Sequence, residues 1–241
     1  MVRKIERMDK TEEQITTNAI AFAKTNKTKI AKELTDKSLF PKDDRPVSVF
    51  MSGSPGAGKT EASKAFLEEL GDDCVIRLDP DDLRERFDDY TGDNSYLFHS
   101  AVSLLIERAL DRAFNNKQSF LLDGTLSSYK VAEKNIERSL RRKRAVLILF
   151  VYQHPSLAWE FVKAREQIEG RRILPKTFID QFFGSQEVIR ELKARFGNQI
   201  KVDLLVKNNV GKTRFYHDNI QAVEYHIGEK FTREELEVLI K

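Results

Sequence analysis

The strongest restriction on the fold of this chain comes from a glycine-rich stretch that follows a short apolar run. Residues 53–60, Gly-Ser-Pro-Gly-Ala-Gly-Lys-Thr, fit the pattern G-x-x-x-x-G-K-[ST]. The run before them, VSVFMSG, is typical of a buried strand, and TEASKAFLEEL after them is typical of a helix. Glycines in such a connection let backbone N–H groups turn inward around an anion. The pattern therefore predicts a phosphate-binding loop.

The predicted loop gives each of its residues a place in a nucleotide site. Backbone N–H groups and the dipole of the following helix would hold the phosphates of ATP or GTP. Lys59 should reach the β- and γ-phosphates, and the hydroxyl of Thr60 should ligate Mg²⁺. A second Gly-Lys-Thr at 211–213 has Val206 where the first glycine is required, so we expect a turn there. The predicted nucleotide-binding residues are Gly53, Ser54, Pro55, Gly56, Ala57, Gly58, Lys59 and Thr60.

Strand-like and helix-like runs alternate through most of the chain. The strand-like runs are apolar throughout, which favours a parallel sheet covered by helices on both faces. We expect an α/β protein with the P-loop NTPase or kinase fold. Strands are predicted at 47–53, 74–79, 119–124, 145–152 and 201–208, and helices at 59–70, 81–89, 97–116, 129–143, 156–169 and 176–196.

Both ends of the chain should add to this core. Residues 11–36 have the pattern of one or two amphipathic helices, so 1–46 is predicted to be a helical extension and 47–241 a P-loop kinase domain. The stretch after 201 indicates an edge hairpin with a glycine turn. A last helix should begin at Thr232, with Glu235 completing a capping box.

Composition and charge argue against several classes of protein. No run approaches the roughly 20 apolar residues of a membrane helix, and the N-terminus lacks the apolar core of a signal peptide. The single cysteine, Cys74, excludes an internal disulfide and agrees with a cytoplasmic location. With 41 basic and 38 acidic residues the net charge is +3, too balanced to indicate a nucleic-acid binder. The basic cluster at 138–144 is interpreted as a solvated helix end.

Carboxylates after two of the predicted strands favour a kinase over a switch GTPase. The guanine-reading Asn-Lys-x-Asp is absent, and the residues after the third strand lack Asp-x-x-Gly. Ligands of open α/β sheets bind beyond the carboxyl ends of the strands, so the acidic cluster at 79–82 belongs near the phosphates. Asp81 could accept the proton of an attacking hydroxyl, although Asp79 or Asp81 could instead cap the following helix. Asp123 could order Mg²⁺ and its waters.

Several spaced elements together resemble the zeta toxins, which are kinases of toxin–antitoxin systems. The resemblance runs from about 47 to about 208 and goes well beyond the phosphate loop. It includes D-x-D-D-L-R followed by Tyr90, a helix that carries Glu107, Asp123-Gly-Thr, Ala-Arg-Glu at 164–166, and Gly-Arg-Arg-x-x-Pro at 170–175. This family phosphorylates UDP-N-acetylglucosamine and related nucleotide sugars.

The resemblance implies roles for the matching residues. Asp81 corresponds to the general base, and Lys59 belongs to the catalytic set. Arg165 corresponds to one of two arginines that clamp the phosphates. The second is best matched by Arg172, although the doublet leaves Arg171 open. Glu107, Thr125 and Asp123 fall on the substrate side, the expected acceptor is a UDP-amino sugar, and an antitoxin is the expected partner.

Some alternatives remain at this level. The acceptor could be a nucleic-acid 5′-hydroxyl or an antibiotic, with the 138–144 cluster as the only support, or the chain could be a non-catalytic nucleotide-binding regulator. Asn135 stands where the family would place a hydroxyl residue, and 88–98 is particular to this chain. The stretch 1–46 lies outside the match and is interpreted as a packing extension rather than an inhibitory segment.

Overall fold

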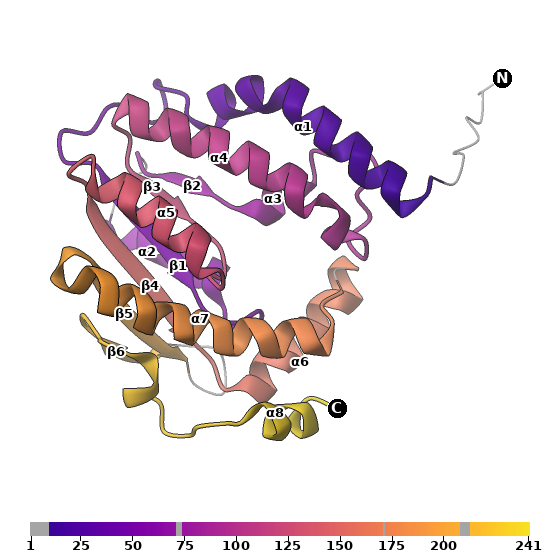
Figure 1. The fold of residues 1–241 in the computed structure, drawn as a ribbon, viewed down its shortest axis with the longest axis vertical. Coiled ribbons are helices and arrows are strands. Elements are labelled where there is room, and N and C mark those ends of the chain that lie inside the picture. The colour runs from indigo at the N-terminus through magenta and orange to yellow at the C-terminus, as the bar shows by residue number, and fades with distance from the viewer. Residues whose placement is uncertain (1–9, 71–73, 171, 208–212) are drawn as a thin grey trace.

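A six-stranded sheet forms the centre of the molecule (Figure 1). The computed structural model describes residues 10–70, 74–170, 172–207 and 213–241. The strand order is β2-β3-β1-β4-β5-β6, parallel throughout except for β6, which pairs antiparallel with β5. The expected fold, a mainly parallel sheet flanked by helices, is confirmed. The strands are β1 (Val47–Ser52), β2 (Ile76–Leu78), β3 (Phe120–Leu122), β4 (Ala145–Tyr152), β5 (Lys201–Lys207) and β6 (Thr213–His217).

Helices cover both faces of this sheet. The face toward α2 buries one set of side chains, including Val49 and Met51, whereas the alternate residue Phe50 faces the larger core on the other side. This alternation follows from the two-residue period of a strand. The described helices are α1 (Glu12–Leu34), α2 (Lys59–Leu70), α3 (Pro80–Arg84), α4 (His99–Asn116), α5 (Tyr129–Leu140), α6 (Pro155–Glu169), α7 (Pro175–Phe196) and α8 (Arg233–Leu239).

The predicted segments are present, but several are shorter than expected. Strands β2 and β3 are three residues each, and β2 lies at the edge of the sheet, paired with β3. The helix predicted at 81–89 ends at Arg84, and the helix predicted at 129–143 ends at Leu140. Lys143 adopts a left-handed backbone with φ of 56°, which a continuing helix excludes.

Within the predicted N-terminal extension, Glu12–Leu34 form one continuous helix. Figure 1 shows α1 running beside α4, outside the layer that covers the sheet. Its buried positions are small or aliphatic, among them Ala23 and Ile30. Lys10 just before α1 pairs with Asp89 at 2.7 Å, which ties the helix to the segment 88–98.

The C-terminal part of the chain also follows the prediction. Strand β6 completes the hairpin with β5, whereas the expected turn includes 208–212, which lie outside the described residues. Thr232 and Glu235 form the reciprocal capping box of α8, with N–H to side-chain distances of 3.2 and 2.8 Å. Within the described part of the chain, no helix combines the length and apolar character that a membrane crossing requires.

Arg144 of the basic stretch is a structural residue buried at the base of the sheet. It is 3% exposed, and its guanidinium donates to the backbone oxygens of Val47 at 2.6 Å and Gln118 at 2.7 Å and to Ser48 Oγ at 2.7 Å. Burial lowers the pKa of Arg144 to about 10, so it remains charged at neutral pH. This arginine therefore joins β1, β4 and the start of β3.

Replacing Arg144 with methionine should lower the free energy of unfolding by about 3 kcal/mol. Two buried carbonyl oxygens would lose their donor, and an unsatisfied buried acceptor costs about 1–3 kcal/mol. Urea denaturation followed by circular dichroism measures this loss. Arg142→Met is the matched control, since that guanidinium lies over the Phe114 ring and donates to one backbone oxygen near the surface. Equal losses in the two variants would contradict the structural role of Arg144.

Candidate active site

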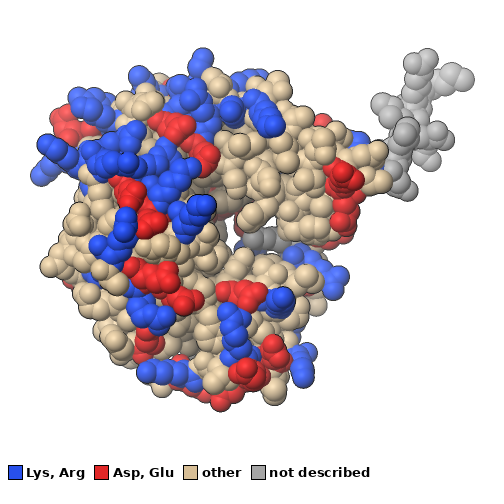
Figure 2. All heavy atoms as spheres, in the orientation of Figure 1, with Lys and Arg blue, Asp and Glu red and all other residues tan. Residues whose placement is uncertain are grey.

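A cavity of about 520 Å³ lies where the parallel strands end. The chain crosses from β3, on one side of β1, to β4, on the other, and ligands of open α/β sheets bind at such a switch point. In Figure 2 the surface is hollowed between the α3–α4 part and the α6–α7 part of the molecule. The cavity is lined by the phosphate loop from Pro55 to Thr60, residues 79–81 and 123–125, part of α6, and Lys207.

The phosphate loop is held in place by the backbone of its neighbours. Gly53 has φ of +132° and Gly56 has φ of +72°. A Cβ atom at Gly53 would lie 2.2 Å from the carbonyl oxygen of Val151 in β4, and one at Gly56 would lie 2.0 Å from that of Ala158 in α6. Neither position accepts a side chain, because both the backbone conformation and the space favour glycine.

Lys59 is folded over this loop. Its ammonium donates to the backbone oxygens of Gly53 at 3.1 Å and Ser54 at 2.6 Å. Helix α2 begins at Lys59, so the N–H groups of its first turn have no partner within the helix and face the region of the loop. Phosphate oxygens would offer the same ammonium a stronger, charge-assisted bond.

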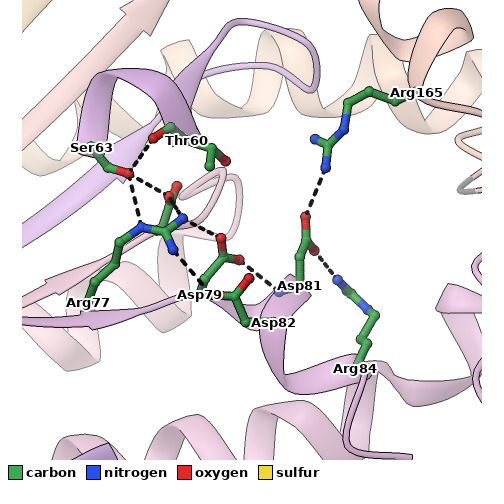
Figure 3. Close-up of polar contacts among 9 residues, drawn as sticks. Thr60, Ser63, Arg77, Asp79, Asp81, Asp82, Arg84 and Arg165 are labelled. Atoms are coloured by element: carbon green, nitrogen blue, oxygen red, sulfur yellow. Dashed lines mark hydrogen bonds and ion pairs between the residues drawn. The ribbon is translucent and has the colours of Figure 1, made fainter. Parts of the chain in front are cut away.

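Three aspartates meet at Arg77 beneath the loop (Figure 3). Arg77 donates to Asp79, to Asp123 Oδ2 at 2.7 Å and to Asp82 Oδ2 at 3.2 Å. Asp123 is 5% exposed, so this guanidinium offsets a buried carboxylate. Burial raises the pKa of Asp79 to about 6, and the charge of Asp81 acts in the same direction. No role for Arg77 is predicted from the sequence. Its position as a charged residue within the apolar run of β2 is the signal that could have indicated one.

The structure shows which of the two aspartates, Asp79 or Asp81, caps α3. Oδ1 of Asp79 accepts the N–H of Asp81 at 2.8 Å, so Asp79 is the cap of α3. The Asp81 side chain points instead toward the cavity, between two guanidiniums (Figure 3). Arg84 contacts one of its oxygens, and Nη2 of Arg165 lies 4.0 Å from the other.

The residues at the start of α2 and the end of β3 fit the Mg²⁺ ion that a P-loop nucleotide carries. Oxygen donors are the ligands that Mg²⁺ prefers, and Thr60 and Asp123 both line the cavity. Ser63 links them: its Oγ lies 2.9 Å from the backbone oxygen of Thr60 and 2.8 Å from Asp123 Oδ2. Ser63 therefore ties the carboxylate of Asp123 to the first turn of α2.

The predicted acceptor residues are only partly brought together. Thr125 lines the cavity, its hydroxyl is 3.0 Å from Ser127 Oγ, and its backbone oxygen accepts from the N–H of Gly53. Glu107, in contrast, is not among the residues that line this cavity. It follows His99, a lining residue, by eight positions on α4, about 12 Å at the rise of an α-helix. Its side chain is 52% exposed and pairs with Lys134 at 2.6 Å.

The predicted second arginine, Arg172, is likewise not among the residues that line the cavity. Arg172 is 65% exposed and lies 3.8 Å from Glu166, outside the lining of the cavity, and the alternative Arg171 lies outside the described residues. A second guanidinium in the cavity comes from Arg84, whose side chain is 8% exposed. Sequence reasoning quoted this residue only as part of the D-x-D-D-L-R pattern.

The remainder of the basic cluster is engaged with its surroundings. Arg138 pairs with Asp111 and lies 4.7 Å from the centre of the Phe114 ring, and Arg142 lies 4.9 Å from the same ring. Figure 2 shows Lys and Arg gathered over the α4–α5 part of this face, with Asp and Glu among them. These partners favour a solvated, partly paired surface, as predicted, over a polyanion site.

The sheet order, the glycine-rich loop after β1 and the helices on both faces define a protein with the P-loop kinase fold. A family model described as zeta toxin matches residues 30–221. The chain belongs to the zeta toxin family.

Solved structures share this fold at low sequence identity. A chain from the PezAT chromosomal toxin–antitoxin system of Streptococcus pneumoniae is 15% identical, with a TM-score of 0.62 over 96% of this chain and 88% of that one. A chain from the AvrRxo1-ORF1:AvrRxo1-ORF2 structure with sulphate ions is 16% identical, with a TM-score of 0.56 over 86% of this chain and 66% of that one. A chain from that complex with ATP is 15% identical, with a TM-score of 0.54 and the same coverage. A search of curated proteins gives no match.

Proposed function

We propose that this chain is a kinase that transfers the γ-phosphate of ATP or GTP to a hydroxyl of a UDP-amino sugar such as UDP-N-acetylglucosamine. The observation that carries the proposal is a single cavity lined by the phosphate loop, Asp81, Thr125 and Arg165. Its volume of about 520 Å³ falls within the usual range of ligand pockets, roughly 300–1,000 Å³. Membership of the zeta toxin family supports the choice of acceptor.

The phosphate loop supplies the donor side of the reaction. Its backbone N–H groups and Lys59 would hold the phosphates, and Lys59 would exchange its two carbonyl partners for phosphate oxygens. Mg²⁺ bound near Thr60 and Asp123 would offset negative charge on the β- and γ-phosphates. The structure of a similar chain in a complex solved with ATP supports nucleotide binding.

Asp81 supplies the acceptor side. The acceptor oxygen attacks the γ-phosphorus while the bond from that phosphorus to the β-phosphate oxygen breaks, and its electron pair leaves with the nucleoside diphosphate. The hydroxyl proton passes to Asp81. Arg84 holds Asp81 from the buried side, and Arg165, whose Nη2 lies 4.0 Å from the same carboxylate, would stabilise the transferred phosphoryl group. Thr125 would orient the acceptor.

Mass spectrometry of a panel of acceptors tests this proposal. Purified protein and Mg·ATP are incubated with UDP-amino sugars, other nucleotide sugars, an aminoglycoside and 5′-hydroxyl oligonucleotides, and each is examined for a gain of one phosphate. We expect the gain on a UDP-amino sugar with the native protein and not with Lys59→Met. A phosphate on the oligonucleotide or the antibiotic alone would overturn the acceptor assignment. Release of free phosphate, with no product from any acceptor, would overturn it as well.

The proposal also covers the protein's partner, its location in the cell and its domain organisation. We infer a protein antitoxin as partner and a cytoplasmic location. Neighbours solved as a toxin–antitoxin system and as an ORF1:ORF2 complex support the partner. We also propose the division into a helical extension, 1–46, and a kinase domain, 47–241. No described residue of α1 lines the cavity, which favours a packing role over an inhibitory one.

A further inference from the structure

Lys207 stands at the carboxyl end of β5, at the edge of the sheet where the phosphate loop follows β1. It is the last residue of the strand, and the pairing register with β6 shifts between Val206 and Lys207. An irregularity of this kind redirects side chains, and bulges are frequent beside functional sites. Lys207 is half-buried and lines the same cavity as Lys59 and Thr60.

The Lys207 side chain lies directly against the phosphate loop. Its Cε atom is 3.6 Å from the place that a Cβ atom would occupy at Gly58, and the Oε2 atom of Glu61 is equally close to that place. Within the described part of the chain, neither a hydrogen bond nor an ion pair within 4.0 Å engages the ammonium of Lys207. Burial lowers the pKa of this ammonium, and the charge of Glu61 partly opposes the effect. A half-buried cation without a close partner is a ready site for an anion.

We propose that Lys207 is a second cationic ligand of the nucleotide phosphates, reaching them from the β5 side of the loop. This inference rests on the proposed function, because it assumes a nucleoside di- or triphosphate on residues 53–60. Lys59 extends from the first position of α2 and would approach the β- and γ-phosphates. Lys207 lies at Gly58 and Glu61, where the loop passes into α2, so it would contact phosphates shared by ATP and ADP.

Isothermal titration of Mg·ATP and Mg·ADP into native protein and variants tests the inference. We expect Lys207→Gln to raise both dissociation constants by about tenfold, since a charge-assisted bond at a half-buried site is lost. Lys207→Arg should recover most of the affinity. Lys64→Gln is the matched control: it removes the same charge from the exposed side of α2, away from the cavity, and should change neither constant more than about twofold. Thermal melting of each variant verifies that it is folded.

The outcomes separate this inference from the proposed function. If Lys207→Gln and Lys64→Gln bind both nucleotides like native protein, Lys207 is not a phosphate ligand, while the kinase proposal stands. If Lys207→Gln lowers the affinity for ATP and not for ADP, Lys207 does not contact the phosphates that the two nucleotides share. If native protein binds neither nucleotide, the proposed function fails first, and the role of Lys207 fails with it.

Discussion

Replacing Asp81 with asparagine should lower turnover of the acceptor by about a thousandfold while nucleotide affinity changes by no more than about threefold. Asparagine keeps the shape of the side chain and its place between two guanidiniums, but it cannot take the proton of an attacking hydroxyl. The carboxylate lines the cavity, whereas the phosphates would be held by residues 53–60. Single-turnover kinetics for transfer and equilibrium titration of Mg·ATP measure the two effects separately.

The neighbouring aspartate provides the control. Asp82→Asn makes the same chemical change one residue away, on a side chain that is 70% exposed and does not line the cavity. This variant should retain activity within about threefold, since its contact with Arg77 at 3.2 Å is at the surface. A large loss of turnover in Asp82→Asn, or normal turnover in Asp81→Asn, would contradict the assignment of Asp81 as the general base. If Asp81→Asn and native protein bind Mg·ATP equally and release phosphate at the same rate, the result would favour a nucleotide-binding regulator.

The phosphate loop and the aspartates of this site are predictable from sequence, because residues close to one another along the chain determine their geometry. The phosphate loop needs glycine where β4 and α6 approach its backbone, and a strand before it with a helix after it. Asp81 and Asp123 follow strand-like runs, and parallel strands bring their carboxyl ends to one edge of the sheet. The sequence therefore places these residues near the phosphates with no knowledge of the packing between helices.

Some residues are harder to place from sequence, because the direction of their side chains depends on which face of a helix is buried or on the path of a loop. Glu107 lies on the exposed face of α4. Its apolar neighbours Leu105 and Ile106 are buried, and this pattern indicates that Glu107 faces away from the core. Arg172 follows the C-terminal glycine of α6, where spacing in the sequence does not determine the direction of a side chain. The match to the family provided a correspondence in sequence, and the structure shows that neither residue reaches the cavity.

Three further cations became visible only in three dimensions. Arg77 reaches from β2 to Asp123 just after β3, Arg84 returns to Asp81 within one turn of α3, and Lys207 extends from β5 to Gly58. Arg84 belongs to the D-x-D-D-L-R pattern, whereas Arg77 and Lys207 belong to no motif of fixed spacing, and charged residues of this kind are usually solvated or paired at the surface. Their significance comes from the elements that bury them against the loop.

Replacing Gly56 with alanine should weaken Mg·ATP binding by at least about a hundredfold and abolish transfer under ordinary assay conditions. The new methyl group would lie 2.0 Å from the carbonyl oxygen of Ala158, which is backbone and cannot turn aside. The left-handed φ of +72° adds about 1 kcal/mol of strain. The loop would have to move away from α6, and a displacement of about 1 Å from the productive geometry is enough for a loss of this size.

Gly124→Ala is the matched control for this variant. Gly124 also lines the cavity, but its φ is not in the left-handed range, and a Cβ atom there would meet nothing within 4 Å. It should therefore bind Mg·ATP like native protein, as measured by titration, with a melting temperature unchanged within about 2 °C. Thermal melting of Gly56→Ala in the absence of nucleotide distinguishes local displacement from unfolding. If Gly56→Ala remains folded and binds Mg·ATP normally, the nucleotide does not use the loop in the conformation held by β4 and α6.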